Sequence, residues 1–326
     1  MNSILVIGGA GYIGSHMVKL LRNSGYGVIV LDDLSGGFGD AVLNAELVVG
    51  SIADAAMLDA LFMRYRFDAV MHFASFIQVG ESVQEPGKYY ANNLSATLML
   101  LEAMRKAGVA RFIFSSTAAV YGDPEYIPID ERHPKQPINP YGRSKWMVEQ
   151  VLEDYDQAYG LKSICLRYFN AAGADPAGEL GERHHPETHL IPLVLQAASR
   201  RRADIAVFGT DYPTPDGTCI RDYIHVVDLC AAHLLALQRL LHGGSSARYN
   251  LGNGEGFSVN EVIETARHIT GRPIAVRYES RRAGDPPRLV ANARLARNEL
   301  GWQPQRAQLD TIVADAWAWE QKFPWN

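Results

Sequence analysis

The sequence predicts an α/β fold in which a doubly wound parallel sheet is joined to a smaller mixed α/β lobe. Over roughly the first half of the chain, short apolar runs alternate with longer amphipathic stretches. This alternation is typical of parallel strands connected by helices that cover both faces of the sheet. Residues 171–186 break the pattern, because they are rich in Gly, Pro, Asp and His. Such a stretch indicates a loop or a domain boundary.

The length of the chain and this change of pattern predict two domains. A chain of 326 residues is long enough for two hydrophobic cores. We expect residues 1–170 to form the first domain, with residues 222–250 returning to it. Residues 171–221 and 251–326 would form the second domain.

Composition excludes several classes of protein. The chain is 47% hydrophobic and 21% charged, with a net charge of −5. It lacks the long basic block that marks many nucleic-acid-binding proteins. Three well-separated cysteines show no metal-binding spacing, so we expect reduced thiols, a cytoplasmic location and no metal site. No apolar stretch is long enough to cross a bilayer, and no signal peptide is evident at the N-terminus, so no membrane partner is expected.

The first strand–helix–strand unit carries a glycine-rich turn. The apolar run Ile4–Ile7 is typical of a buried parallel strand. A glycine turn at 8–14 follows it, then an amphipathic helix, then a second strand at 28–31 that ends at Asp32. The glycines of the turn are Gly8, Gly11 and Gly14.

This unit is the context that a dinucleotide-binding fingerprint requires. Glycines let the backbone approach a pyrophosphate, and the helix N-terminus offers unpaired N–H groups to it. Asp32 can accept hydrogen bonds from a ribose diol. No Arg or Lys follows through Gly37, so the sequence favours NAD over NADP. The alternative is a glycine-rich turn that binds nothing.

Further strands and helices follow in alternation. The expected strands are 47–49, 69–74, 111–115 and 162–168, and the expected helices are 53–65, 92–107 and 141–159. In such sheets ligands bind outside the carboxyl ends of the strands. Polar side chains gather at those ends, namely Asp32, Ser51, Ser75, Ser115, Ser116, Thr117 and Asn170.

A tyrosine–lysine pair lies at the start of the helix 141–159. Tyr141 and Lys145 are four residues apart and would therefore share one helix face. A phenol titrates near pH 10 and is a poor base at neutral pH, but a fixed cation lowers its pKa. The pair can thus take a proton from an alcohol while a hydride leaves the same carbon. Thr117 would lie in the same crevice and could relay that proton, or simply cap the strand end.

The second part of the chain has mixed elements. The expected helices are 190–200, 228–241, 258–270 and 309–322, and the expected strands are 205–208 and 249–251. Arg221 and Arg282 could bind a pyrophosphate bidentately, and Asp285 could bind a ribose hydroxyl. The alternative for each residue is a surface ion pair.

Taken together, these motifs resemble the extended short-chain dehydrogenases and, within them, the UDP-glucose 4-epimerases. The similarity covers nearly the whole chain. It depends on segments that include GGAGYIGSH from Gly8, YYANN from Tyr89, FIFSSTAAVYGD from Phe112, PYGRSK from Pro140, LRYFNAAGA from Leu166 and RRAGDPP from Arg281. No single segment is specific, but the combination is.

The resemblance implies a role for each matching residue. Tyr141 would be the base, Lys145 would lower its pKa, and Thr117 would be its hydroxyl partner. The residues implied to bind NAD are Gly8, Gly11, Tyr12, Ile13, Gly14, Asp32, Asp33, Leu34, Ser35, Gly36, Gly37, Ser51, Ile52, Phe73, Ala74, Ser75, Ile77, Asn92, Ser115, Tyr141, Lys145 and Phe169. The residues implied to bind the UDP-sugar are Thr117, Tyr141, Asn170, His189, Leu190, Phe208, Arg221, Tyr223, Arg282, Asp285 and Leu289.

The implied reaction is redox-neutral. Tyr141 would deprotonate the sugar 4-hydroxyl as a hydride passes to NAD. The 4-keto sugar would then turn over, and hydride would return to its opposite face, interconverting UDP-glucose and UDP-galactose. The resemblance also implies a homodimer packed through the helices at 92–107 and 141–159.

The sequence departs from the family pattern at four positions, and three other activities are considered. Ser51 stands where many relatives have an aspartate, Ile77 where some have lysine, and His189 where one branch has asparagine. Leu289 stands where a bulky tyrosine favours hexoses without an N-acetyl group, so a UDP-N-acetylhexosamine or UDP-pentose 4-epimerase is an alternative.

Two other functions fit the sequence less well. A dehydratase would need an acid just after Thr117, where alanines follow. A non-catalytic NAD-sensing protein typically lacks the Tyr–Lys pair.

Overall fold

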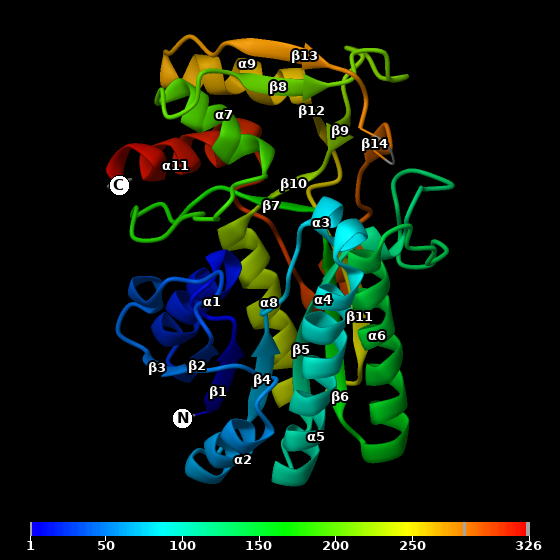
Figure 1. The fold of residues 1–326 in the computed structure, drawn as a ribbon. Helices are drawn as coiled ribbons and strands as arrows, with labels where there is room; N and C mark the ends of the chain where they lie inside the picture. Colours follow the sequence, from blue (N-terminus) through cyan, green and yellow to red (C-terminus); the bar gives the residue numbers. More distant parts are fainter. Residues whose placement is uncertain (1, 283–284, 324–326) are drawn as a thin grey trace.

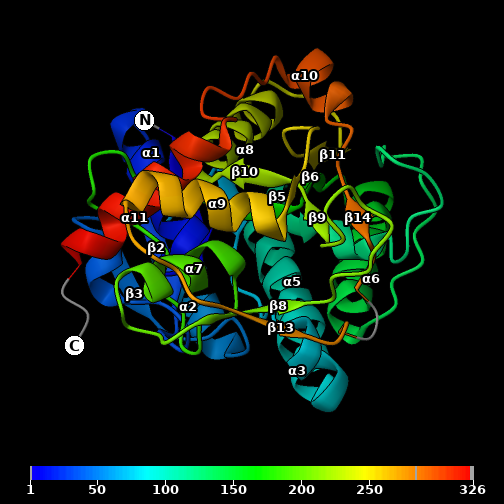
Figure 2. The ribbon, with the colours of Figure 1, turned by 90° about the horizontal axis from the view of Figure 1, so that it is seen from above.

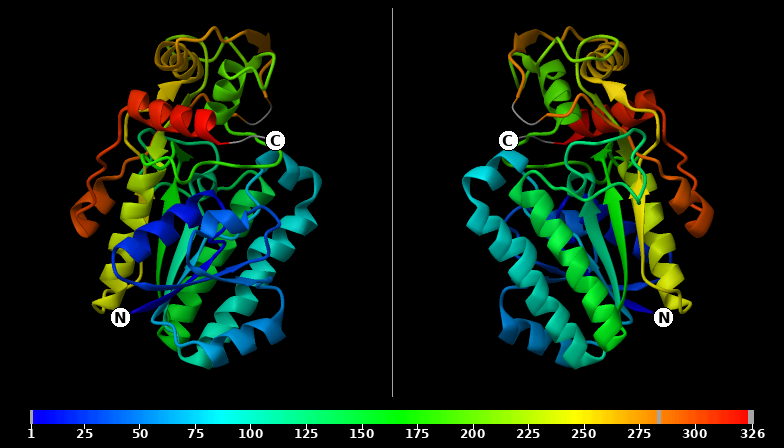
Figure 3. Two further views of the ribbon diagram at one scale, coloured as in Figure 1. Left: turned by 90° about the vertical axis from the view of Figure 1, so that its left-hand side faces the viewer. Right: turned by 90° about the vertical axis from the view of Figure 1, so that its right-hand side faces the viewer.

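The computed structural model describes residues 2–282 and 285–323. A central sheet with helices on both faces forms one end of the molecule, and a smaller lobe lies over the carboxyl edge of that sheet (Figure 1). The two side views show the same arrangement, with the smaller lobe above the central sheet (Figure 3). None of the helices within the described residues is both long and apolar enough to cross a membrane.

The central sheet has seven parallel strands, as predicted for a doubly wound fold. Its order is β11-β6-β5-β4-β1-β2-β3, and every pairing in it is parallel. The strands are β1 (Ser3–Ile7), β2 (Gly27–Asp32), β3 (Glu46–Val49), β4 (Ala69–His72), β5 (Arg111–Thr117), β6 (Lys162–Tyr168) and β11 (Ala247–Leu251). The order reverses beside β1, and ligands of such sheets bind at that reversal.

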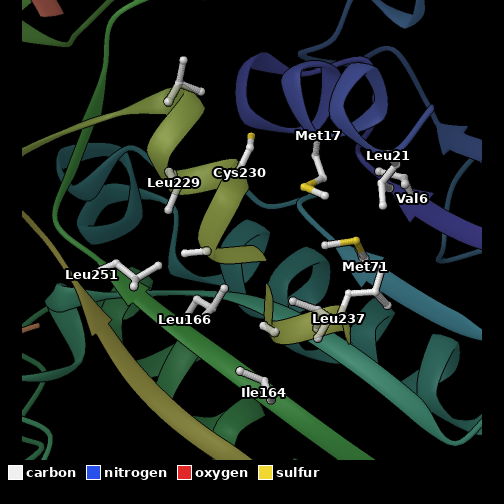
Figure 4. Packing of buried hydrophobic residues seen from close by; sticks show 14 of the residues in the cluster. Val6, Met17, Leu21, Met71, Ile164, Leu166, Leu229, Cys230, Leu237 and Leu251 are labelled. Atoms are coloured by element: carbon white, nitrogen blue, oxygen red, sulfur yellow. The ribbon is translucent and has the colours of Figure 1, made fainter. Parts of the chain in front are cut away.

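Helices cover the sheet on two sides, and each side has its own hydrophobic core. The helices that pack on one face are α1 (Tyr12–Asn23) and α8 (Val226–Leu241), with α10 (Arg294–Leu300) beside α8. Figure 4 shows Met17, Cys230 and Leu237 of α1 and α8 meeting Val6, Met71 and Leu166 of the sheet. The helices on the other face are α2 (Ala55–Arg64), α5 (Thr97–Ala107) and α6 (Pro140–Tyr159).

The smaller lobe has a third core between three helices and short strands. Its helices are α7 (Leu190–Ala198), α9 (Val259–Thr270) and α11 (Leu309–Lys322). Viewed from above, α9 and α11 run across the lobe, with β8 and β13 along its edge (Figure 2). The lobe's strands form three small sheets, β7 (Asn170–Ala172) with β10 (Tyr223–His225), β8 (Ile205–Phe208) with β13 (Val276–Glu279), and β12 (Phe257–Ser258), β9 (Ile220–Arg221) and β14 (Arg288–Leu289).

The prediction of a helix at 92–107 is wrong in its first part. A π-helical segment, η2 (Tyr90–Ala96), precedes α5. The short helices α3 (Val79–Gln84) and α4 (Pro86–Tyr89), and the 3₁₀ turns η1 (Gly39–Val42) and η3 (Ala118–Val120), were also not predicted. π-Helical segments are rare and occur frequently at functional sites, and this one lies beside the segment that follows β4, as described below.

Candidate active site

The residues predicted to bind a dinucleotide meet at the carboxyl edge of the central sheet. The glycine turn follows β1, Asp32 ends β2, Ser51 and Ile52 follow β3, and Phe73 follows β4. Ser115 lies near the end of β5, and Phe169 follows β6. Since all of these strands are parallel, their ends share one edge, and the sequence prediction of a common crevice agrees with this topology.

The geometry of the glycine turn fits a ligand that approaches the backbone. A Cβ on Gly14 would lie 2.0 Å from the Gly8 carbonyl oxygen, so the fold itself requires glycine there. Gly11 is different, because a Cβ there would meet only the Gly8 oxygen, at 3.5 Å, and its φ of −80° suits any residue. Gly11 is the N-cap of α1 and offers no side chain to its first turn. The turn therefore leaves open backbone where a pyrophosphate would bind.

Asp32 is a buried carboxylate that organises the next loop. Its two oxygens accept the N–H groups of Ala10 and Leu34, each at 2.9 Å. Burial raises the pKa of Asp32, and these two backbone hydrogen bonds oppose that rise. Leu34 has a φ of +60°, which is unusual for a non-glycine residue and is often found at functional sites. Asp33 is exposed and holds the Ser35 backbone and hydroxyl, so it lies on the rim of this loop.

Asn93, which the sequence analysis did not single out, holds the segment after β4. Its side-chain oxygen accepts the Phe76 N–H and its amide donates to the Phe76 carbonyl, both at 3.0 Å. The amide also lies 3.3 Å from the Ser144 hydroxyl on α6. The predicted residue Asn92 donates to Asn93 at 3.0 Å, and predicted Ile77 leaves 38% of its surface exposed. The π-helical segment η2 thus places Asn93 in contact with both Phe76 and Ser144.

Helix α6 begins in the way the sequence predicts. The Asn139 side chain accepts the Gly142 N–H at 2.8 Å as the N-cap, and Pro140 is the first helical residue. Gly160, with a φ of +69°, ends the helix. Tyr141 is half-buried in the first turn, and Lys145 follows one turn later. The cap therefore fixes where the phenol enters the crevice.

Lys145 is buried and held by the ends of two strands. Its ammonium donates to the Ser75 hydroxyl and to the Ser115 carbonyl, each at 2.7 Å, and only 2% of the residue is exposed. It also lies 4.8 Å from the centre of the Phe114 ring. Burial lowers the pKa of Lys145 to about 7. This lysine is therefore a preorganised cation whose charge is sensitive to its surroundings.

Tyr141 shares the crevice with Thr117 and a second phenol. Burial raises the pKa of Tyr141, while a hydrogen bond with the Thr117 side chain lowers it. Thr117 also accepts the Ala119 N–H at 3.1 Å, and the Tyr168 hydroxyl pairs with the Ser115 hydroxyl. Burial raises the pKa of Tyr168, and the nearby Tyr141 raises it further. Sequence reasoning missed Tyr168, although it ends β6 next to the predicted residue Phe169.

A buried ion pair supports α6 one turn beyond Lys145. Glu149 and Arg167 have side chains that are 0% and 1% exposed, and Arg167 Nε donates to Glu149 Oε1 at 2.9 Å. Ser116 donates to the same oxygen at 2.6 Å, and Arg167 donates to the Tyr121 hydroxyl at 2.9 Å. Ser116 lies between Ser115 and Thr117, so this network joins the helix to the strand that carries both.

Thr117 and Tyr141 belong to β5 and α6, and five of the other residues predicted to bind a UDP-sugar form two groups in the smaller lobe. The Arg282 guanidinium lies 3.7 Å from the centre of the Phe208 ring. Arg221 donates to Asp285 at 3.3 Å. Leu289 lies opposite Arg221 in the β9–β14 pairing, and both Leu289 and Phe169 pack against the buried cluster of Val120, Tyr121 and Ile129. The structure thus brings the two predicted arginines, Asp285 and Leu289 to the side of the lobe formed by β8, β9 and β14.

Four other predicted residues, Asn170, Tyr223, His189 and Leu190, lie elsewhere in the lobe. Asn170 and Tyr223 are partners in the β7–β10 pairing, but only 4% of Tyr223 is exposed, so it contributes mainly to the core. His189 is the N-cap of α7, directly before Leu190. Its ring faces Glu182 and Glu187 rather than the arginines.

Fold and site together define a nucleotide-binding α/β protein of the Rossmann type, with a tyrosine–lysine pair at the reversal of strand order. Residues 4–252 match the NAD dependent epimerase/dehydratase family, and the chain belongs to that family.

Similar proteins carry more specific names. The chain is 51% identical to a UDP-glucose 4-epimerase of Halalkalibacterium halodurans, over 99% of this chain and 96% of the relative. The crystal structure of UDP-glucose 4-epimerase from Brucella ovis in complex with NAD has a TM-score of 0.95 and 50% identity, over 97% of this chain and 98% of that one. The UDP-Glc/GlcNAc 4-epimerase from Campylobacter jejuni has a TM-score of 0.87 and 44% identity, over 99% of this chain and 100% of that one.

Proposed function

We propose that this protein is an NAD-dependent epimerase that interconverts UDP-glucose and UDP-galactose by transient oxidation at C4 of the sugar. The observation that supports this most is the placement of Lys145. Its ammonium is fixed between Ser75 and Ser115, one turn beyond Tyr141, at the strand ends where a dinucleotide binds. The relatives named UDP-glucose 4-epimerase, at about half identity over nearly the full chain, support the particular activity.

In this proposal Tyr141 is the group that moves the proton. Its phenolate oxygen takes the proton of the sugar 4-hydroxyl, directly or through Thr117, and returns that proton as the ketone is reduced. Burial opposes the phenolate, so the phenolate needs compensating partners. Thr117 supplies a hydrogen bond, and the ammonium of Lys145 supplies positive charge one helical turn away.

The remaining predicted residues hold the cofactor and the nucleotide. When bound along the glycine turn, NAD supplies the hydride acceptor and a positive charge. Asp32 orients the loop from 33 to 37, and Asn93 orients the segment from Phe73 to Ile77. Arg221 and Arg282 bind the UDP pyrophosphate, and Asp285 binds a ribose hydroxyl. Because the reaction is redox-neutral, cofactor need not leave between turnovers.

A second activity is proposed beside the first. Leu289 is smaller than the tyrosine that favours simple hexoses in relatives, and it packs against the same small hydrophobic cluster as Phe169, which follows β6. The similar protein from Campylobacter jejuni is named a UDP-Glc/GlcNAc 4-epimerase. We therefore include UDP-N-acetylhexosamines, and UDP-pentoses, as candidate substrates.

The test uses the purified protein with no added cofactor. Incubation with UDP-galactose, UDP-N-acetylgalactosamine and UDP-xylose, followed by separation of the products, ranks the three substrate classes. Tyr141→Phe is expected to reduce epimerisation by about 10²-fold or more, the scale of proton-transfer catalysis, while NAD still co-purifies. If activity and NAD are lost together, Tyr141 is structural. If activity survives, another group is the base.

We further propose a cytoplasmic homodimer with the predicted division into two domains. The three cysteines are free and buried, as suits a reducing compartment. Met147 and Tyr159 on α6 are 39% and 56% exposed, which supports a partner on that helix. Light scattering of Met147→Glu against wild-type protein tests this interface, since a monomeric variant is expected.

A further inference from the structure

A cluster of two histidines and two glutamates lies just before α7 and includes His189, which the family resemblance implied to bind the UDP-sugar. Glu182, His184, Glu187 and His189 each offer one ligand atom, and these atoms lie within 4.8 Å of one another. All four come from one eight-residue loop that leads into α7. No metal site was predicted from the sequence, because its three cysteines show no metal-binding spacing.

The ligand atoms of the cluster lie close enough together to share one ion. His189 Nδ1 lies 2.7 Å from Glu182 Oε1 and 3.3 Å from Glu187 Oε1. His184 Nδ1 lies 3.1 Å from Glu182 Oε1 and 3.6 Å from Glu187 Oε2. At metal–ligand distances of about 2.0–2.2 Å, the ligand atoms of a tetrahedral zinc site lie about 3.3–3.6 Å apart. Two of the four separations, 3.3 and 3.6 Å, fall in this range, and the other two, 2.7 and 3.1 Å, are shorter.

The facing atoms converge on one point instead of forming hydrogen bonds. Glu182 Oε1, His184 Nδ1 and His189 Nδ1 are buried, and none has a hydrogen-bond partner of acceptable geometry among the described residues. The Glu182 side chain is 94% buried, since only 6% of it is exposed. A buried carboxylate oxygen without a donor is costly. Its position against two imidazole nitrogens calls for positive charge there, carried either by protons on the two histidines or by a metal ion between the four side chains.

The surroundings of the cluster suit a cation of charge +2. Two carboxylates would neutralise the charge of the ion, and two neutral imidazoles would complete its coordination. Glu187 Oε1 accepts the backbone N–H groups of Thr188 and His189 at 2.7 and 2.8 Å, so this carboxylate is already oriented, as the ligands of metal sites usually are. A cavity of about 350 Å³ lined by Glu182, His184 and Glu187 of the cluster, and by Phe38, provides a route of entry.

We propose that Glu182, His184, Glu187 and His189 bind one divalent transition-metal ion, with Zn²⁺ the preferred metal. The site is structural, because four protein ligands close its coordination. It fixes the loop that places Leu190 at the start of α7. It also braces that loop against α1, since the His184 ring makes an edge contact with Tyr12 at 6.3 Å between centroids.

Metal analysis of tag-free protein tests this proposal. Wild-type protein, supplied with equimolar Zn²⁺ and then desalted, is expected to retain about one zinc per chain, and His184→Gln and Glu187→Gln less than about a tenth of that. His185→Gln is the matched control, because His185 lies in the same loop, is exposed and is outside the ligand set. It is expected to retain the metal. Bound NAD and the far-ultraviolet spectrum report whether each variant is folded.

Cobalt gives a second readout on the unaltered chain. Co²⁺ bound to the wild-type protein is expected to give the intense visible absorption of a tetrahedral site, and Zn²⁺ is expected to displace it. Two results would overturn the proposal. One is a wild-type protein that retains neither Zn²⁺ nor Co²⁺, in which case the cluster consists of two imidazolium–carboxylate pairs. The other is a metal content that His184→Gln and Glu187→Gln leave unchanged.

Discussion

Replacing Glu149 with glutamine tests how the buried ion pair supports the catalytic helix. Glu149 is fully buried on α6, one turn after Lys145, and it accepts hydrogen bonds from Arg167 and Ser116. Glutamine keeps the size of the side chain but removes its charge. The guanidinium of Arg167, which is 1% exposed, would then be buried without a counter-ion. Arg248 Nε, 3.2 Å from Glu149 Oε2, would also lose its partner.

The expected cost follows from burial. Removing one partner of a buried ion pair destabilises a protein by about 3–5 kcal/mol, because the remaining charge is uncompensated. For proteins of a few hundred residues, each kcal/mol lowers Tm by about 2–4 °C. Glu149→Gln should therefore lower Tm by about 6–20 °C. Since the network also holds Ser116, between Ser115 and Thr117, we expect kcat to fall as well.

The measurement is thermal unfolding of NAD-loaded protein, followed by circular dichroism, with kcat determined at a temperature where both proteins are folded. Glu153→Gln is the matched control. Glu153 lies one turn further along α6 and also pairs with Arg248, at 2.9 Å, but its side chain is 54% exposed. Exposed pairs contribute about 0–1 kcal/mol, so Tm should change by no more than a few degrees.

A double variant separates charge from packing. Adding Arg167→Met to Glu149→Gln removes the unpaired guanidinium, so the double variant should be more stable than Glu149→Gln alone. The reasoning is refuted if Glu149→Gln has the Tm of Glu153→Gln, or if the double variant is less stable than the single one.

Two further predictions concern proton transfer and pH. Thr117→Val removes the hydrogen bond that lowers the pKa of Tyr141. We therefore expect kcat at neutral pH to fall by about tenfold, the equivalent of one hydrogen bond, and the pH–rate profile to move to higher pH. Thr117→Ser should behave like wild type, and an unmoved profile in the valine variant would show that this hydroxyl does not act on Tyr141. Burial lowers the pKa of His72 to about 3 and of His233 to about 4, whereas unfolded histidine titrates near about 6.5. Below about pH 6.5 the unfolded chain therefore binds protons that the folded protein does not bind. The contribution of these two histidines to the free energy of unfolding should be fully present above about pH 6.5 and should fall as the pH drops toward about 4. Urea midpoints between pH 7.5 and 5 measure this, and a flat dependence would contradict it.

The alternation of apolar runs predicted the central sheet well, because each of its strands is a local apolar segment. Helix α11 was predicted at its observed bounds, since its apolar face is regular. Segments β7, β9, β12 and β14 have two or three residues each. Their strand character comes only from partners far along the chain, which no local pattern encodes. The π-helical turn before α5 was missed because its residues also suit an α-helix.

The candidate site was predictable where chemistry depends on spacing along the chain. The Tyr141–Lys145 pair and the glycine turn are of this kind. Contacts across the fold were not predictable in the same way. Asn93 clamps Phe76, Glu149 holds Arg167, and Tyr168 pairs with Ser115. Each of these is a buried or half-buried polar side chain whose partner lies on another element, so the residue type alone gives no signal.

The late position of β11 has a consequence for biosynthesis. This strand completes one edge of the central sheet by pairing with β6, but residues 169–246 lie between the two strands. A ribosome must therefore release most of the polypeptide before that edge can be covered, and until then β6 presents open backbone groups to any neighbouring chain. Fragments that stop near residue 170 should accordingly aggregate, and the nascent protein should depend on chaperones until β11 has emerged.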